Sequence, residues 1–387
     1  MKFISVSDFP PSKIYILLDK NYRKFLIEKS MIKLNCKNYF ELSLKINEML
    51  KSKFNGGDIN YWLQGERLDK RTGKIHPKFM PLTLVLKLIK LNKEKIESLN
   101  KNTISYRSGG RGLVVSKLVL PIKVTPELDS IVIHLFGDGS AGEFTPSYTQ
   151  KNKEGVDNFI KKLENCFGFF EKSVYFTQGK YQVKFPKAIT DILSYYYQIK
   201  SYKSYESEIP VIILKRKDNL YKIACIAAFL VDEAQVRDVV LFYSANKILI
   251  RGIKRLVKDC NYKSSEVKFN KKAREYYFCL SNKNIEKFYK DLKNLSTRFN
   301  TCNLSFKDKD VEFIIKRRKI INPKDSKVTN EIITKLLEKE GTLTAQNISK
   351  LSNYAHCTVI HHLKDLYDKK TVKREKITNG SYLWSNN

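Results

Sequence analysis

The amino-acid sequence predicts an α+β protein with three parts. Three observations lead to this prediction. Helical periodicity dominates residues 1–104, a segment of about 95 residues occurs twice in the middle of the chain, and residues 326–387 read as three helices followed by two strands. The 387 residues are 42% hydrophobic and 12% aromatic, enough to bury more than one core. We therefore expect several folded domains.

Residues 1–104 are predicted to form a helical domain. Apolar residues recur with helical spacing in ELSLKINEML (41–50) and PLTLVLKLIKL (81–91), with a turn at FNGGD (54–58) between them. DINYWLQG (58–65) then reads as a short helix ended by a glycine. This order resembles the helix-turn-helix of DNA-binding domains, although Trp62 and Leu63 equally suit the core of any small helical bundle.

A basic, glycine-rich segment follows the helical domain. SYRSGGRGLVVSK (105–117) has no periodic apolar residues in its first half, so we expect a linker over residues 105–119. Its arginines, Arg107 and Arg111, are candidates for contacts with phosphate groups.

Residues 120–320 contain an internal repeat. Thr125 and Pro126 predict the start of a helix, and an apolar stripe then runs to Gly137, Asp138 and Gly139. A shift of about 95 residues repeats the stripe over 223–231, followed by Asp232, Glu233 and Ala234, so that Asp138 falls on Glu233 and Tyr148 on Tyr243. We expect two αββαββ-like halves, over 120–205 and 206–320, packed about a pseudo-twofold axis.

The repeat places one carboxylate at the end of each apolar helix. If the two helices meet on the axis, Asp138 and Glu233 lie side by side, where they can hold a divalent metal such as Mg²⁺. Taken alone, Gly-Asp-Gly is an ordinary helix stop and turn, but the match to Glu233 favours a paired acidic site. Asp232 is a third metal-ligand candidate, because a different helix phase would exchange its role with that of Glu233.

IVIHLFGDG (131–139) and IAAFLVDEA (226–234) resemble the paired motifs of LAGLIDADG homing endonucleases. The resemblance implies that the motif helices form the interface between two halves, that Asp138 and Glu233 are the catalytic, metal-binding acids, and that two antiparallel sheets grip DNA. It also implies a basic residue near the nucleophilic water, for which Lys184 and Lys187 are only guesses. The chain lacks the terminal residues of a splicing intein, so we expect a free-standing member similar to the archaeal ones.

Residues 326–387 predict a winged helix-turn-helix. Helices are expected over 329–339, 345–352 and 355–369, followed by two strands around a turn at 378–380. The expected core comprises Leu336, Leu337, Ile348, Leu351, Val359, Leu363 and Leu366. The face with His356, Thr358, His361 and Lys364 would be free to enter a major groove, although winged helices also bind proteins.

The net charge of +32 favours a polyanionic partner, and nucleic acid is the leading candidate. The residues expected to contact DNA are Arg107, Arg111, Lys184, Lys271, Lys272, Arg274, Arg317, Arg318, Thr358, His361, Lys364 and Arg374. The sequence has no apolar run long enough to span a membrane, no signal-peptide pattern and no CxxC spacing among its seven cysteines. We therefore expect a cytoplasmic, monomeric protein with reduced thiols and no membrane partner.

The favoured function is Mg²⁺-dependent, site-specific cleavage of double-stranded DNA. The alternative is a transcriptional regulator that uses the same scaffold to bind DNA without cutting it. A factor for RNA maturation is a third possibility, since it would share the basic surface.

Overall fold

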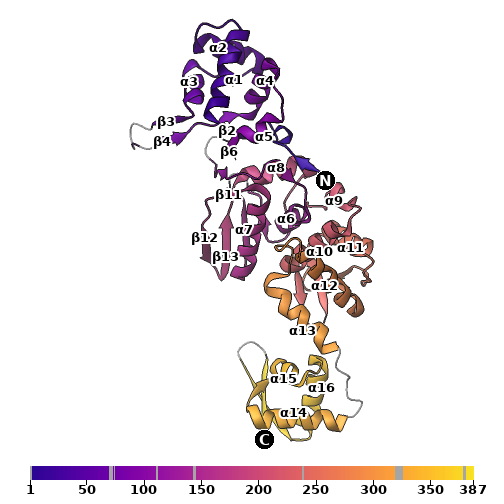
Figure 1. Ribbon diagram of the computed structural model, residues 1–387. Coiled ribbons are helices and arrows are strands. Elements are labelled where there is room, and N and C mark those ends of the chain that lie inside the picture. Colours follow the sequence, from indigo (N-terminus) through magenta and orange to yellow (C-terminus); the bar gives the residue numbers. More distant parts are fainter. Residues whose placement is uncertain are drawn as a thin grey trace.

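The computed structural model describes residues 2–68, 73, 75–109, 112–142, 145–237, 239–318, 326–377 and 381–387. It combines helices with several small sheets, so the predicted α+β class is confirmed. Figure 1 shows an elongated molecule with the N-terminal helices at one end and the C-terminal unit at the other. Among the described residues, no helix has both the length and the apolar character needed to cross a membrane.

Four helices make up most of the N-terminal region. They are α1 (Lys20–Lys33), α2 (Tyr39–Leu50), α3 (Gly56–Gln64) and α4 (Leu82–Asn92). The helices predicted from the apolar spacing of 41–50 and 81–91 are confirmed as α2 and α4. The expected turn at 54–58 is shorter, because Asn55 caps α3 and the next three residues already belong to the helix. Trp62 is buried, as a core residue would be.

A five-stranded sheet joins this region to the middle of the chain. Its order is β11-β7-β6-β2-β5, formed by β2 (Ile14–Leu18), β5 (Met80–Pro81), β6 (Thr103–Ser108), β7 (Val115–Ser116) and β11 (Phe169–Phe170). The linker expected over 105–119 is therefore wrong, because this segment contains β7 and most of β6, and Tyr106 is fully buried. One continuous hydrophobic core runs from Ile4 to Ile315.

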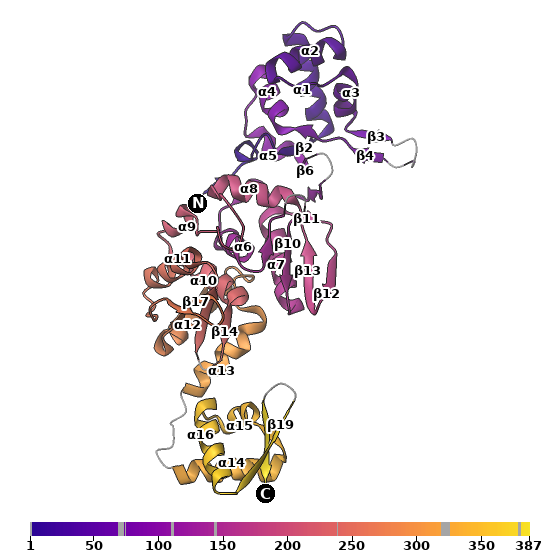
Figure 2. The same cartoon turned by 180° about the vertical axis from the view of Figure 1, so that it is seen from behind.

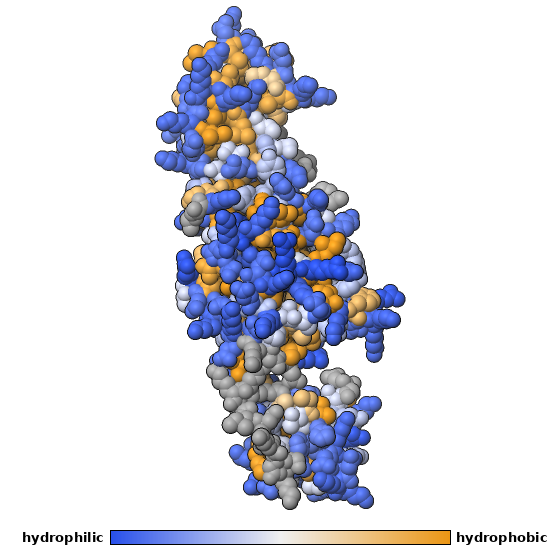
Figure 3. All heavy atoms as spheres, turned by 90° about the vertical axis from the view of Figure 1, so that its right-hand side faces the viewer, coloured by the Kyte–Doolittle hydropathy of each residue, from blue (hydrophilic) through white to orange (hydrophobic). Residues whose placement is uncertain are grey.

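Short elements complete the N-terminal region and its junctions. They are β1 (Phe3–Ile4), which pairs with β8 (Ile122–Lys123), the hairpin of β3 (Glu66–Leu68) and β4 (Ile75–Pro77), and α5 (Ser98–Asn102). Figure 3 shows apolar side chains gathered over the N-terminal helices among hydrophilic ones. Phe25, Ile32, Phe40 and Leu44 are exposed apolar residues of α1 and α2.

The middle of the chain contains two successions of elements in the same order. Apart from β11, which lies between α7 and β12 and belongs to the five-stranded sheet, the first is α6 (Pro126–Phe136), β9 (Gly139–Ser140), β10 (Ser147–Gln150), α7 (Lys153–Phe167), β12 (Val174–Thr177), β13 (Lys180–Lys184) and α8 (Lys187–Tyr197). The second is α10 (Asn219–Glu233), β14 (Ala234–Val236), β15 (Val240–Ser244), α11 (Lys247–Asp259), β16 (Lys268–Asn270), β17 (Glu275–Leu280) and α12 (Asn282–Ser296). We call them half one and half two; α9 (Val211–Leu214) lies between them and α13 (Asp308–Arg318) follows.

The sheets of the two halves also have matching strand orders, β12-β13-β10-β9 and β16-β17-β15-β14. Figure 2 shows β10, β13 and β12 of half one side by side. Tyr148 lies opposite Gly139, and Phe242 lies opposite Ala234. Tyr148 therefore corresponds to Phe242, and the match to Tyr243 expected from the sequence is wrong by one residue. The reason is that the connection between the first two strands is one residue shorter in half two, and a one-residue slip exchanges the faces of a strand.

The C-terminal unit has its own hydrophobic core. It consists of α14 (Ser326–Glu340), β18 (Leu343–Thr344), α15 (Ala345–Ser352), α16 (His356–Asp368), β19 (Val372–Lys376) and β20 (Tyr382–Asn386), with sheet order β18-β20-β19. Leu337, Ile348, Val359, Leu363 and Leu366 are buried as predicted, and Leu336 is partly buried. Leu351 is 51% exposed, so its place in the predicted core is wrong. The turn expected at 378–380 lies outside the described residues.

A buried ion pair joins the N-terminal ends of α6 and α10. Arg216 Nε lies 2.7 Å from Asp129 Oδ2 and its Nη2 lies 2.8 Å from Oδ1, a bidentate arrangement. The side chain of Asp129 is fully buried, and Tyr197 donates a further hydrogen bond to it. This ion pair thus holds half one and half two together at the N-terminal ends of α6 and α10, whereas Asp138 and Glu233 lie at their C-terminal ends.

Replacing Arg216 with methionine should lower the free energy of unfolding by about 3 kcal/mol, because it leaves the Asp129 carboxylate buried without its cation. Urea denaturation measures this change. The control is Lys153→Met, which removes an exposed ion pair with Asp157 and should change the free energy by less than about 0.5 kcal/mol. Equal losses in the two variants would contradict the role given to the buried pair.

Candidate active site

The candidate site lies where α6 and α10 end. Thr125 caps α6 and Pro126 occupies its first turn, as predicted, and the whole helix is buried. α10 runs to Glu233 and passes directly into β14. Ala234 has an extended backbone, with φ −134° and ψ 151°, so an alanine is accommodated where the first motif has glycine.

Gly137 makes the close approach of the two helix ends possible. A Cβ atom at this position would lie 2.7 Å from the Cβ of Asp232, which is closer than two carbon atoms can pack. The φ of Gly137 is −85°, so the glycine is needed for space rather than for a left-handed backbone. In the 95-residue repeat Gly137 corresponds to Asp232, and the missing side chain on one helix makes room for the carboxylate on the other.

Four hydrogen bonds involve Asp232 and Asp138, and three of them join Asp232 of half two to side chains of half one. The Tyr148 hydroxyl donates to Asp232 Oδ1 at 2.6 Å, and His134 Nδ1 lies 2.9 Å from Oδ2. Gln150 Nε2 lies 3.1 Å from Asp232 Oδ1 and 2.5 Å from Asp138 Oδ2. One amide therefore bridges the two carboxylates, and the side chain of Asp232 is fully buried.

A buried lysine fixes the protonation of His134. Lys162 Nζ lies 3.0 Å from His134 Nε2, and both side chains are buried. Burial, and then the charge of Lys162, hold the pKa of His134 well below its ordinary value, so the ring is neutral. Because Nε2 accepts a hydrogen bond from the Lys162 ammonium, the ring proton is on Nδ1, which donates a hydrogen bond to Asp232.

The pKa values of all three acids are raised. Burial raises the pKa of Asp138, with the Asp232 charge as the second cause, and burial also raises the pKa of Asp232. For Glu233, burial followed by the charges of Asp138 and Asp232 raises the pKa to about 7. Repulsion among these buried carboxylates disfavours their ionised forms, and a bound cation would reduce this repulsion.

Lys307 is a basic residue of this site, where the charge of Lys180 also opposes the rise in the pKa of Asp138. Its Nζ donates to the backbone oxygens of Leu230 and Ala234, at 2.8 and 2.6 Å, at the end of α10. Burial lowers its pKa, and the charges of the three acids oppose this shift. Sequence reasoning missed Lys307 because no spacing links it to the acids. Of the residues guessed from the sequence, Lys187 donates to backbone oxygens at 141 and 142, and Lys184 lies over the Tyr175 ring.

The donors at this site suit Mg²⁺ in their chemistry. Magnesium prefers carboxylate oxygens, keeps several waters, and commonly takes only one or two protein carboxylates together with phosphate oxygens of the substrate. Asp138 and Glu233 offer such oxygens next to the buried Asp232. Within the described residues no group of three His, Cys, Asp or Glu side chains forms a ready-made metal cage. The site therefore fits a metal completed by water and substrate rather than one enclosed by protein.

Most of the predicted DNA-contacting residues of the middle region lie on the surface. Lys184 is exposed on β13, and Lys271, Lys272 and Arg274 are exposed in the turn between β16 and β17. In contrast, Arg107 is half-buried with its guanidinium 4.3 Å from the Phe79 ring centroid, and burial lowers its pKa. The phosphate contact expected for Arg107 from the sequence stays a prediction. Arg111 and the side chains of Arg317 and Arg318 lie outside the described residues.

In the C-terminal unit, His361 and Lys364 are exposed on α16, and Thr358 is half-buried beside them. Arg374 is exposed on β19, where it stacks on the rings of Tyr367 and Tyr382. Aromatic packing fixes the direction of its side chain without removing its charge from solvent.

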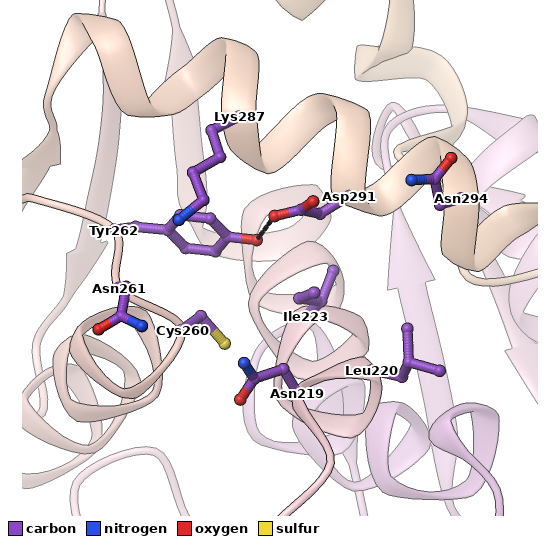
Figure 4. Close-up of a pocket in the computed structure, with 9 residues that line it drawn as sticks. All are labelled: Asn219, Leu220, Ile223, Cys260, Asn261, Tyr262, Lys287, Asp291 and Asn294. Carbon is purple, nitrogen blue, oxygen red and sulfur yellow. Dashed lines mark hydrogen bonds between the residues drawn. The ribbon is translucent and has the colours of Figure 1, made fainter.

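A separate hollow of about 270 Å³ lies at the opposite end of α10. Figure 4 shows Asn219, Leu220 and Ile223 of α10 lining it together with residues of α12 and the end of α11, and the Tyr262 hydroxyl donates to Asp291 at 2.7 Å. The hollow is thus distinct from the acidic site.

The sequence matches no family model, and it matches no curated protein. Among solved structures, it is similar to mesophilic variants of the homing endonuclease I-DmoI, with 13% identity and a TM-score of 0.32 over 43% of this chain and 96% of that chain. I-DmoI in complex with DNA and Mn gives 12% identity and a TM-score of 0.32 over 44% and 97%. Full-length DUF199/WhiA from Thermatoga maritima gives 11% and 0.33 over 64% and 92%. Scores of this size assign neither a fold nor an activity.

Replacing Gly137 with alanine should destabilise the protein by about 1–3 kcal/mol, since the added methyl group meets Asp232 where the two helices touch. Thermal or urea unfolding measures the loss. Gly142→Ala is the matched control, because its nearest non-neighbouring atom would be 3.4 Å from the new Cβ. If the two variants unfold alike, the close approach of α6 and α10 is not a constraint.

Divalent cations should stabilise the protein more at high pH. Glu233 has a folded-state pKa of about 7 against an ordinary value of 4.5, so the folded state binds more protons than the unfolded state between these values. Without metal, this group makes stability fall as the pH rises through that window. Since a metal needs the ionised carboxylates, millimolar Ca²⁺ should raise the melting temperature at about pH 8 and have little effect at about pH 5.

Differential scanning fluorimetry at both pH values tests this cation effect. The double variant Asp138→Asn, Glu233→Gln should lose the response, and Glu266→Gln, at an exposed acid paired with Lys254, should keep it. A calcium effect independent of pH, or retained in the double variant, would place the cation elsewhere.

Proposed function

We propose that the chain binds specific sites in double-stranded DNA and cleaves both strands in a Mg²⁺-dependent reaction. The observation that carries the proposal is the meeting of Asp138, Asp232 and Glu233 at the ends of two buried helices, beside Lys307. The two motifs that contain these acids also resemble those of LAGLIDADG homing endonucleases. The net charge of +32 supports a polyanionic substrate.

The acids have different roles in this proposal. Asp138 and Glu233 face the substrate and hold the metal, which when bound activates water and neutralises the charge of the leaving oxygen. Asp232 is buried and bonded to Tyr148 and His134, so it positions its neighbours and adds negative charge without touching DNA. Gln150 fixes the separation of Asp138 from Asp232.

Lys307 is the proposed partner of the reacting water. A lysine held by two backbone oxygens, with a pKa that burial lowers, can orient a water molecule through its remaining N–H group. Its charge also balances part of the negative charge of the acids before DNA arrives.

The remaining parts would supply binding. One face of each sheet packs on a helix, α7 or α11, and the other face is open. Each sheet begins next to an acid, since β9 follows Asp138 and β14 follows Glu233. We propose that the C-terminal unit acts as a winged helix, with His361 and Lys364 of α16 in a major groove and Arg374 near the backbone. The α2–α3 pair would act as the N-terminal helix-turn-helix. One chain would suffice, because both halves of the site belong to it.

The alternative function is a DNA-binding regulator that does not cleave. One observation favours it: burial raises the pKa values of the acids, which favours their neutral forms without a metal. Both functions require sequence-specific binding, so cleavage alone separates them.

Cleavage and binding should respond differently to substitutions in the site. We expect the wild type to produce discrete ends within bound genomic fragments in Mg²⁺, and only binding in Ca²⁺. Asp138→Asn and Glu233→Gln should abolish cutting, and Lys307→Met should slow it by about 100-fold, with binding retained. Sequencing of bound fragments and new ends gives both readouts.

The control for the cleavage experiment is Lys309→Met, at an exposed lysine two residues further along, which should cut normally. Circular dichroism shows whether each variant is folded. If the wild type enriches discrete sites without producing ends in Mg²⁺, the regulator is the correct function.

A further inference from the structure

The sheets of the two halves can be compared position by position. In both, one face packs on a helix, α7 in half one and α11 in half two, and the other face is open. With Tyr148 corresponding to Phe242, the strand registers place Val183 on Phe278 and Phe176 on Phe269. On the central strands, the helix-facing pairs Tyr148/Phe242 and Val183/Phe278 are therefore buried in both halves, whereas Phe176 and Phe269 on the outer strands are exposed.

The open faces of the two sheets carry different kinds of side chain at corresponding positions. Four positions on the central strands correspond as Ser147 to Leu241, Thr149 to Tyr243, Gln182 to Tyr277, and Lys184 to Cys279. None of these eight side chains is buried. Hydrogen-bonding and basic groups in half one are thus replaced by aliphatic, aromatic and thiol groups in half two.

The side-chain contacts on the two open faces differ in the same way. In half one, the Gln182 amide lies 3.3 Å from the hydroxyl oxygens of both Ser147 and Thr149, so these polar groups form one small network. In half two, the Tyr243 and Tyr277 rings lie 6.2 Å apart between centroids, and the Tyr243 hydroxyl donates to Gln235 Oε1 at 3.3 Å, so aromatic rings replace the amide and aliphatic hydroxyl groups of half one. The neighbouring position on the outer strand reverses the pattern, with Tyr175 in half one and Lys268 in half two.

The major groove of DNA presents two kinds of chemistry to such surfaces. Amide, hydroxyl and ammonium groups bind the hydrogen-bonding edges of bases, whereas apolar groups distinguish thymine by its 5-methyl group. We infer that the two sheets read the two halves of one asymmetric target by different chemistry, and that the Leu241, Tyr243, Tyr277 and Cys279 surface contacts thymine methyl groups. This inference rests on the proposed function, since it requires that the open faces bind duplex DNA.

The positions of charged residues around the open face of half two agree with an apolar contact to bases and a basic contact to phosphates. Lys268 and the exposed Lys271, Lys272 and Arg274 lie at the outer strand and its turn, where they can contact phosphates. On the open face of half one, Lys180 and Lys184 stand on the inner strand, and Lys180 corresponds to Glu275 in half two. Half two thus keeps its positive charge at the rim of its apolar surface.

Removal of methyl groups from DNA tests this inference directly. The full chain would select binding sites from a random duplex library in Ca²⁺, and each thymine of the selected site would then be replaced by uracil, which lacks only the methyl group. We expect thymines to be enriched on one side of the site, and each uracil there to weaken binding by about fourfold. Uracil on the other side should have no effect.

Two variants assign the sides to the halves. Tyr277→Gln, which introduces the residue of half one, should remove the thymine preference and the uracil effect on the thymine-rich side. Gln182→Ala should change the sequence preference on the other side only. A uracil effect that is equal on both sides, or absent from both, would overturn the inference while leaving DNA binding intact. Failure to enrich any sequence would contradict the proposed function itself, and the inference with it.

Discussion

The contact between Gly137 and Asp232 is the constraint on which the rest of the middle region depends. It lets two largely buried helices end side by side, and because each helix is followed at once by the first strand of a sheet, β9 and β14 both begin at the acids. A buried carboxylate is unfavourable unless donors surround it, and Tyr148, His134 and Gln150 supply them. The hydrogen bonds of Asp232 therefore hold the halves together at the same place where the chemistry would occur.

The site combines opposite electrostatic tendencies. Most of the molecule carries positive charge that attracts a polyanion, while its centre holds three acids that would repel the phosphates of that polyanion if ionised. Protons or metal ions remove this conflict, and they compete for the same oxygens. Lys307 and Lys162 reduce the negative charge from within, one directly and one through His134.

Local signals explain what the sequence could predict. The apolar stripe of 128–136, its Thr125 cap and the helices of the C-terminal unit depend on periodicity and on neighbouring residues, and the structure contains them at nearly the expected bounds. The strands β2 and β6 were missed because they are short and lie among helical segments. Lys307 was missed because its contacts at Leu230 and Ala234 are 77 and 73 residues away along the chain. The sequence matched Tyr148 to Tyr243 instead of Phe242 because a constant shift of 95 residues does not allow for the connection between the first two strands, which is one residue shorter in half two.

The pairing of β11 with β7 has a consequence for how this protein could be taken apart. Phe169 and Phe170 belong to half one, yet they complete a sheet whose other strands come from the N-terminal region. A break after the first hundred or so residues would leave an open sheet edge and bare apolar side chains on both products. The N-terminal helices therefore cannot be moved to another protein as an independent domain, because they share one hydrophobic core with the middle of the chain. The C-terminal unit has a separate core and is suited to such an exchange.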